Sequence, residues 1–169
     1  MEKEIVNRVA NSPLVTIDLE ELYPAGERME LDISQWLYEG LILREKEYRE
    51  HINNHDWDQY KDAYVFIHCA TDAIIPGWAF LLVSLQLSGI ASKVHIGSRE
   101  EMEASLYMDT ISNLDLSEYQ DKPVIIKGCS DKYIPDNAYV QLAQRLQPLA
   151  KSIMYGEACS SVPLYKRKK

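Results

Sequence analysis

The chain has 169 residues, of which 46% are hydrophobic and 26% charged. These proportions are typical of a globular protein and exclude a largely disordered or collagen-like chain. The net charge is −8, which disfavours nucleic acid as a partner because most of the surface would repel a phosphate backbone. No apolar run fits a signal peptide or a membrane span, so we expect a cytoplasmic protein without a membrane partner.

In chain order, residues 1–53 read as an N-terminal αββα appendage. We expect it to cover a sheet edge or to form a dimer contact. This segment offers more apolar surface than one side of a helix needs for packing, through Trp36, Leu37, Leu41 and Ile42. A homodimer is therefore the expected assembly. The expected elements are a helix over residues 2–11, strands over 14–19 and 28–33 around a turn at 24–26, and a long amphipathic helix that Ser34 caps and that runs through Leu37, Leu41, Tyr48 and Ile52.

Residues 54–97 and 113–156 form an internal repeat, in which Asn54 aligns with Asn113. The two segments share 14 positions, with a slip of one position between Cys69 and Cys129. Such agreement, with matching residues at both ends of the segments, indicates a duplication. The alternative is that two βαβ units converged on a similar pattern.

Each copy predicts one βαβ unit. Short apolar runs over residues 64–69 and 123–126 have no alternation, which is typical of parallel strands covered on both faces. Asp72 and Asp131 then open helical patterns, with a proline at the fourth position after each aspartate. Second strands are expected over 93–96 and 152–155, and a helix over 98–112 connects the copies.

The fold class is therefore α/β, with a mostly parallel sheet built from the two repeated βαβ units in flavodoxin-like or Rossmann-like order. We expect one domain over residues 1–169. Residues 157–169 would form a C-terminal tail whose basic end is solvated.

The three cysteines follow strands of this expected sheet. Cys69 ends the first strand of the repeat, Cys129 ends the third, and Cys159 follows the fourth. With the strand order 2-1-3-4, all three would reach the carboxyl edge where ligands bind in open parallel sheets. Helices expected to begin just after Cys69 and Cys129 would favour thiolates through their N-terminal partial charge. The alternative is that the cysteines are small buried hydrophobic residues.

A metal site follows from this placement. Three thiolates with one further ligand suit tetrahedral zinc or an iron–sulfur cluster, so the expected cofactor is zinc or iron. Asp72 is the preferred fourth ligand, followed by Asp131 and His68, because both aspartates recur beside the cysteines. The alternative role for the aspartates is capping a helix N-terminus. The sequence has no glycine-rich phosphate-binding motif, so no nucleotide cofactor is expected.

Several long stretches carry a resemblance to a known family. The stretches EIVNRVANSPLVTIDLEELYP, CATDAIIPGWA, NLDLSEYQDKPVIIKGCSDKYIP and GEACSSVPLYKRK resemble the bacterial domain of unknown function number 2480. The resemblance implies no reaction and no catalytic residues. It does imply a genomic setting beside iron–sulfur assembly genes, which makes that machinery the expected protein partner.

Two functions follow from the sequence. The first is a thiol and metal-site protein, an accessory of iron–sulfur cluster assembly or sulfur handling that uses Cys69, Cys129 and Cys159. The second is a noncatalytic scaffold or protein-interaction protein in which the cysteines are structural. An enzyme with Cys69 or Cys129 as nucleophile has less support, because no histidine is an evident base.

Overall fold

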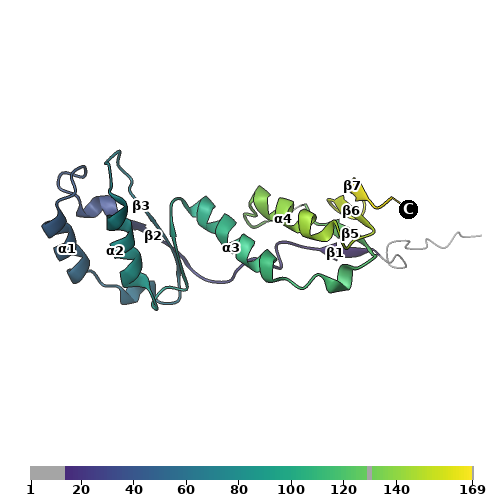
Figure 1. Cartoon of the computed structure of the whole chain (residues 1–169), viewed down its shortest axis with the longest axis horizontal. Helices are drawn as coiled ribbons and strands as arrows, with labels where there is room; N and C mark the ends of the chain where they lie inside the picture. The colour runs from purple at the N-terminus through teal and green to yellow at the C-terminus, as the bar shows by residue number, and fades with distance from the viewer. Residues whose placement is uncertain (1–13, 129–130, 169) are drawn as a thin grey trace, which may run out of the picture. The chain divides into compact units, whose positions relative to one another are not determined.

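The computed structural model describes residues 14–128 and 131–168. The chain divides into two compact units, each with its own mainly parallel sheet (Figure 1). Unit 1 comprises Met1–Pro24 with Ala104–Lys169, and unit 2 comprises Ala25–Glu103. The fold is thus α/β with mostly parallel strands, as predicted. No helix within the described residues is long and apolar enough to cross a membrane.

Unit 2 contains a three-stranded parallel sheet in the order β2-β3-β4. The central strand buries Val65 and Ile67, and Leu31 of β2 lies opposite Ile67. Val65 and Ile67 point to one fully buried face of β3, while Tyr64 and Phe66 on the other face are half-buried. The elements are β2 (Arg28–Asp32), a 3-10 turn η1 (Ile33–Trp36), α1 (Glu45–Asn54), a 3-10 turn η2 (Asp58–Tyr60), β3 (Tyr64–His68), α2 (Gly77–Leu87) and β4 (Lys93–Ile96).

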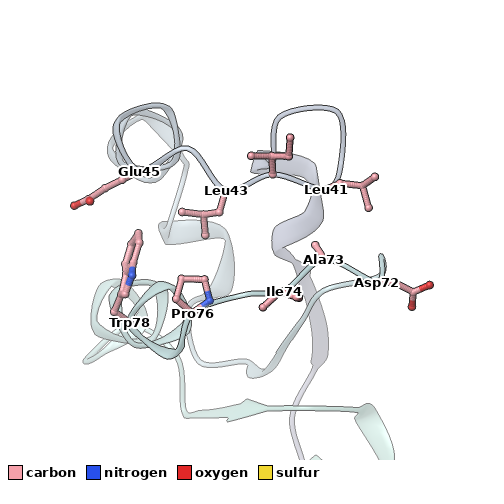
Figure 2. Close-up of a pocket in the computed structure, with 9 residues that line it drawn as sticks. Leu41, Leu43, Glu45, Asp72, Ala73, Ile74, Pro76 and Trp78 are labelled. Carbon is pink, nitrogen blue, oxygen red and sulfur yellow. The ribbon is translucent and has the colours of Figure 1, made fainter.

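Helices α1 and α2 belong to the same hydrophobic core as this sheet. Tyr48 and Ile52 of α1 are buried with Val83 and Leu87 of α2. The buried Tyr48 hydroxyl donates a hydrogen bond to the carbonyl of Ala79 at 3.2 Å, which joins the two helices. The segments that lead into these helices run side by side (Figure 2).

A buried ion pair ties the end of unit 2 to its first strand. Arg28 Nε lies 2.8 Å from Glu103 Oε1, and the two side chains are only 6% and 3% exposed. Glu103 belongs to α3 (Arg99–Asn113), the helix that contains the boundary between the units. Ser98 and Glu101 cap that helix reciprocally, since each side chain accepts a hydrogen bond from the other residue's amide.

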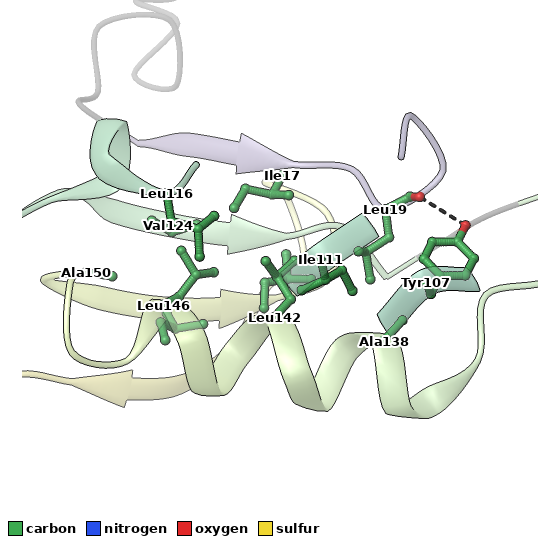
Figure 3. Close-up of a cluster of buried hydrophobic side chains, with 12 residues drawn as sticks. Ile17, Leu19, Tyr107, Ile111, Leu116, Val124, Ala138, Leu142, Leu146 and Ala150 are labelled. Carbon is green, nitrogen blue, oxygen red and sulfur yellow. Dashed lines mark hydrogen bonds between the residues drawn. The ribbon is translucent and has the colours of Figure 1, made fainter. Parts of the chain in front are cut away.

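Unit 1 contains a four-stranded sheet in the order β1-β5-β6-β7, in which only β7 is antiparallel. Its core packs Val124 of β5 against Leu142 and Leu146 of α4, and the Tyr107 hydroxyl donates to the carbonyl of Leu19 (Figure 3). The elements are β1 (Val15–Ile17), the end of α3, a 3-10 turn η3 (Ser117–Tyr119), β5 (Pro123–Ile126), α4 (Asp136–Leu146), β6 (Ser152–Tyr155) and β7 (Val162–Lys166).

The two units repeat one arrangement. In unit 2 the β3-α2-β4 segment pairs with the earlier strand β2, and in unit 1 the β5-α4-β6 segment pairs with the earlier strand β1. Asp18 follows β1 and Asp32 lies at the end of β2, and each carboxylate accepts a hydrogen bond from the amide at the second position after it. In each unit the repeated arrangement therefore includes one strand from the segment 1–53.

The expected strand order was wrong. The repeated segments do not share one sheet in the order 2-1-3-4, because β3 and β4 lie in one sheet and β5 and β6 in another. Two early strands make this possible, since each covers one edge of a different repeat instead of pairing with each other. The expected flavodoxin-like or Rossmann-like order is not found in the described residues.

The long helix expected after Ser34 was also wrong. Asp32, not Ser34, caps a short 3-10 turn, and α1 begins only at Glu45. Between them the chain reverses at Gly40, which has a φ of 71° that glycine adopts without strain, and Tyr38 pairs with Ile42 across the turn. Trp36 and Leu37 of the expected dimer contact are buried inside unit 2, whereas Leu41 and Ile42 are exposed.

The C-terminal segment forms a strand where only a tail was expected. Residues 162–166 are strand β7, which pairs with β6 through a register shift between Ile153 and Met154. At the other end of the chain, the helix expected over residues 2–11 lies outside the described residues.

Replacing Glu103 with alanine should lower the free energy of unfolding by about 3–5 kcal/mol, because the Arg28 guanidinium would stay buried without its carboxylate. The matched control is Glu47→Ala, which removes the carboxylate of the exposed Arg44–Glu47 pair and should cost less than about 1 kcal/mol. Urea unfolding measures both. Equal losses for the two variants would contradict the structural role of the buried pair.

Candidate functional site

The Asp32 carboxylate joins the carboxyl ends of β2 and β3. Its Oδ1 accepts hydrogen bonds from the amides of Ser34 at 2.9 Å and Ala70 at 3.0 Å, and its Oδ2 accepts from the Ser34 hydroxyl at 2.6 Å. Burial alone would raise the pKa of Asp32, but these hydrogen bonds and the nearby His68 outweigh it, so the pKa lies below its ordinary value. The ionised carboxylate therefore fixes where the loop after β3 begins.

Cys69 is the first residue of that loop and is half-buried. Its Sγ lies 3.4 Å from the Thr71 hydroxyl and 3.5 Å from the Thr71 carbonyl oxygen. A pocket of about 380 Å³ opens here, lined by His68, Cys69 and Phe80 among others. His68 Nε2 lies 2.5 Å from Glu30 Oε1, so its imidazole is held by a carboxylate of the neighbouring strand.

Thr71 ties this loop to the loop before α1. Its hydroxyl donates a 2.6 Å hydrogen bond to the carbonyl of Gly40, at the reversal of that loop. The two segments then run side by side toward α1 and α2 and enclose an apolar groove of about 560 Å³ (Figure 2). Glu45 lies at one end of the groove and Asp72 at the other. Leu41, Ile42, Leu43, Ala73, Ile74, Pro76 and Trp78 complete its lining.

An exposed apolar stripe on α2 begins at Trp78, which also lines the groove. Trp78, Leu81 and Leu85 are 37%, 59% and 69% exposed, and their spacing of three and four positions places them in one stripe. After Gly77, the polar residues of α2 are Ser84 and Gln86, and all others are apolar. The helix is therefore apolar on both its buried and its outer side. We call the exposed side chains Leu41, Ile42, Ile74, Trp78, Leu81 and Leu85 the apolar face.

The second copy of the repeat provides an internal comparison for this stripe. In the alignment that pairs Asn54 with Asn113, Trp78 corresponds to Asn137, Leu81 to Val140 and Leu85 to Gln144 of α4. Helix α4 therefore keeps the same buried side, including Leu142 and Leu146, but presents a mainly polar outer side. Packing within a unit does not require an apolar outer stripe, since α4 packs without one.

The cysteines predicted as metal ligands are not shown to come together. Cys69 follows β3 of one sheet, whereas the exposed Cys159 follows β6 of the other, so these two thiols do not share one sheet edge. Cys129 lies outside the described residues. Among the residues that are described, no three His, Cys, Asp or Glu side chains form a group that could hold a metal ion.

Asp72 and Asp131 do not lie at the helix N-termini where they were expected. Helices α2 and α4 begin at Gly77 and Asp136, with Pro76 and Pro135 in the capping positions. Asp72 and Asp131 thus lie in exposed loops before the helices, and neither is the N-cap. Because α2 starts only at Gly77, well beyond Cys69, the expected effect of its N-terminal charge on that thiol is lost, since such effects fade within one helical turn.

The equivalent position in unit 1 has different chemistry. Lys127 stands where unit 2 has His68, and its Nζ lies 2.6 Å from Asp18 Oδ2. Burial is the largest single influence on the pKa of Asp18 and raises it, but the ion pair with Lys127 and the hydrogen bond from the Glu20 amide together outweigh burial, so the pKa lies below its ordinary value. The two repeats therefore share a strand-end aspartate but not its partner.

Sequence reasoning missed the apolar face, although a signal for it was present. The segment GWAFLLVSLQL is far more apolar than its counterpart DNAYVQLAQRL in the second copy. A helix that is apolar on every side is typically covered on every side.

Comparison with known proteins identifies a family. The model of a family described as "Protein of unknown function (DUF2480)" matches residues 3–167 of the chain. No curated protein and no solved structure matches the chain.

The pH dependence of stability tests the role of Asp32. Because its pKa in the folded chain lies below the ordinary value of 3.8, the carboxylate stabilises the fold above that pH, and this stabilisation is lost as the pH falls through the lower folded pKa. Asp32→Asn should be less stable than the wild type at pH 6, and the difference should shrink below pH 3.8. Asp58→Asn, at an exposed site, is the control. A difference that stays constant with pH would contradict this role.

Proposed function

The chain belongs to the DUF2480 family, and because the description of that family names no activity, we propose from the structure alone that the protein is a noncatalytic interaction protein. It docks another protein on the apolar face of unit 2. Leu85 and its neighbours supply the contact area, and the cysteines are structural.

The single observation that carries this proposal is the outer stripe of α2. Trp78, Leu81 and Leu85 are exposed, whereas the equivalent helix α4 carries Asn137, Val140 and Gln144. A leucine that is 69% exposed contributes little burial energy to the fold of its own unit. Isolated exposed leucines are ordinary, but a continuous row beside an apolar groove marks an interaction site.

The extent of the apolar face supports the same function. Ile74 is 95% exposed at the edge of the groove, and five more large apolar side chains extend the surface along α2 and the loop at Leu41. Six such side chains offer several hundred Å² of apolar area, which reaches the roughly 300–600 Å² of the largest patch on a typical monomer. Aromatic anchors such as Trp78 are the residues that most often dominate binding energy at interfaces.

Substituting the stripe tests the proposal. Leu81→Gln with Leu85→Gln gives α2 a polar outer side like that of α4, and the double variant should lose the proteins that co-purify with the wild-type chain from its own cells. Its free energy of unfolding should change by less than about 0.5 kcal/mol per substitution, because exposed positions away from special contacts have small effects. The matched control is Val140→Gln, an exposed apolar position on α4 that should retain all partners.

Two results would contradict the proposal. If the double variant keeps the same co-purifying proteins as the wild type, the stripe is not a docking surface. If it loses several kcal/mol of stability, the stripe is covered within the protein itself.

A thiol and metal function stays as the second candidate. The observation in its favour is that Cys69 and His68 both line a pocket of about 380 Å³ at the carboxyl end of a parallel sheet, where ligands commonly bind. With this function the protein would be an accessory of iron–sulfur assembly or sulfur handling, with zinc or iron held by Cys69, Cys129 and Cys159.

Metal analysis of protein purified without oxygen separates the two candidates. If the cysteines are structural, the chain should contain much less than one zinc or iron per molecule, and Cys69→Ser, Cys129→Ser and Cys159→Ser should each leave that value unchanged. Stoichiometric metal that any one of these substitutions removes would contradict the interaction proposal and favour the metal centre.

A further inference from the structure

The net charge of the chain is concentrated in the unit that carries the apolar face. Residues 25–103 contain 14 Asp and Glu but only 7 Lys and Arg, so unit 2 accounts for −7 of the net charge of −8. Unit 1 contains 12 acidic and 11 basic residues and is nearly neutral. A partner that approaches unit 2 therefore meets a negative potential, which favours partners of positive charge.

The same sign prevails at the groove itself. The exposed carboxylate of Asp72 lines one end, and Glu39 lies on the same loop as the groove residue Leu41. Two arginines beside the groove already pair with carboxylates of unit 2. Arg49 pairs with Glu45 at 2.9 Å and lies against the ring of Trp78, and Arg44 pairs with Glu47 at 3.1 Å and lies over the ring of Tyr38.

The shape of the apolar face restricts the class of possible partners further. From Trp78 through Leu81 to Leu85 the row extends about 10 Å along the helix axis, at a rise of about 1.5 Å per residue, and Trp78 at its start lines the groove together with Ile74. A straight apolar row of this kind accepts another helix, whose own row of side chains at spacings of three and four positions packs against it.

From these observations we infer that the occupant of the apolar face is an amphipathic helix with Lys or Arg residues flanking its apolar row, presented by a partner protein. The inference rests on the proposed docking function and assigns its ligand class. Apolar side chains of the partner helix enter the groove and cover Leu81 and Leu85. Its basic residues lie near Asp72 and Glu39.

Charge also decides against a second copy of this chain as the occupant. Pairing two copies through the apolar face would bring two units with a net charge of −7 each together, and carboxylates within the Debye length of about 8 Å at an ionic strength of about 0.15 M would repel one another across the contact. The homodimer expected from the sequence is therefore not the assembly that this face favours.

Three synthetic peptides test the inference on the full chain. The first is a helix-forming peptide of about 18 residues, roughly five turns, with a leucine row flanked by lysines. The second keeps the leucines and replaces each lysine with glutamate. The third contains the residues of the first in scrambled order, so that no apolar row forms. Fluorescence anisotropy of labelled peptides gives the affinities.

The lysine peptide should bind at least about tenfold more tightly than either of the others, and its affinity should fall as salt rises from about 50 to about 200 mM. Asp72→Lys should weaken binding of the lysine peptide severalfold. The matched control Asp58→Lys changes the unit's charge equally, but at an exposed position that does not line the groove, and should have a smaller effect. Leu81→Gln with Leu85→Gln should abolish binding.

The remaining outcomes separate this inference from the docking function beneath it. Equal binding of the lysine and glutamate peptides would overturn the charge preference and leave the docking face standing. If no peptide binds while cellular partners still depend on Leu81 and Leu85, the helical ligand class is wrong. If the chain forms a dimer that the double variant dissociates, the occupant is a second copy and the inference fails. If the double variant changes neither peptide nor partner binding, the docking function fails as well.

Discussion

Parallel pairing of β2 with β3 is the constraint on which unit 2 depends. It places Asp32 beside the loop that follows β3, where its carboxylate accepts the Ala70 amide. The segments that follow β2 and β3 therefore leave the sheet at the same edge. There the Thr71 hydroxyl donates a hydrogen bond to the carbonyl of Gly40. The apolar groove is a consequence of this approach, because its two walls are the continuations of these two strands.

The groove and the stripe on α2 have a common physical origin in the divergence of the two repeats. Both copies bury one side of a helix against a parallel sheet. Such packing requires only one apolar stripe on each helix. Helix α2 of unit 2 adds a second stripe through Leu81 and Leu85, which α4 does not share, and unit 2 also carries −7 of the chain's net charge of −8. Exposed apolar area inside an acidic unit gives both contact energy and selection by charge, a combination that neither feature gives by itself.

Local patterns predicted the elements of the fold better than their assembly. The strands at 93–96 and 152–155 were confirmed at their predicted bounds, because short β-rich runs between turn residues mark strands directly. Strand order was not predictable, since it depends on which early strand pairs with which repeat, and no local pattern in the sequence specifies that β1 pairs with β5 and β2 with β3. The predicted cysteine site depended on that order. The helix expected after Ser34 stops at Trp36, because Leu37 is already extended, and the reversal that follows was visible in the sequence only as the single glycine Gly40.

Covalent footprinting of solvent-exposed side chains, in purified protein and in the cells from which the chain comes, tests the central claim most directly. We expect Leu81 and Leu85 to be labelled strongly in the purified chain and protected in cells, while Val140 of α4 is labelled equally in both. Equal labelling of Leu81 and Leu85 in the two settings would mean that nothing docks there. Protection already present in the purified monomer would mean that the face is part of the protein's own interior.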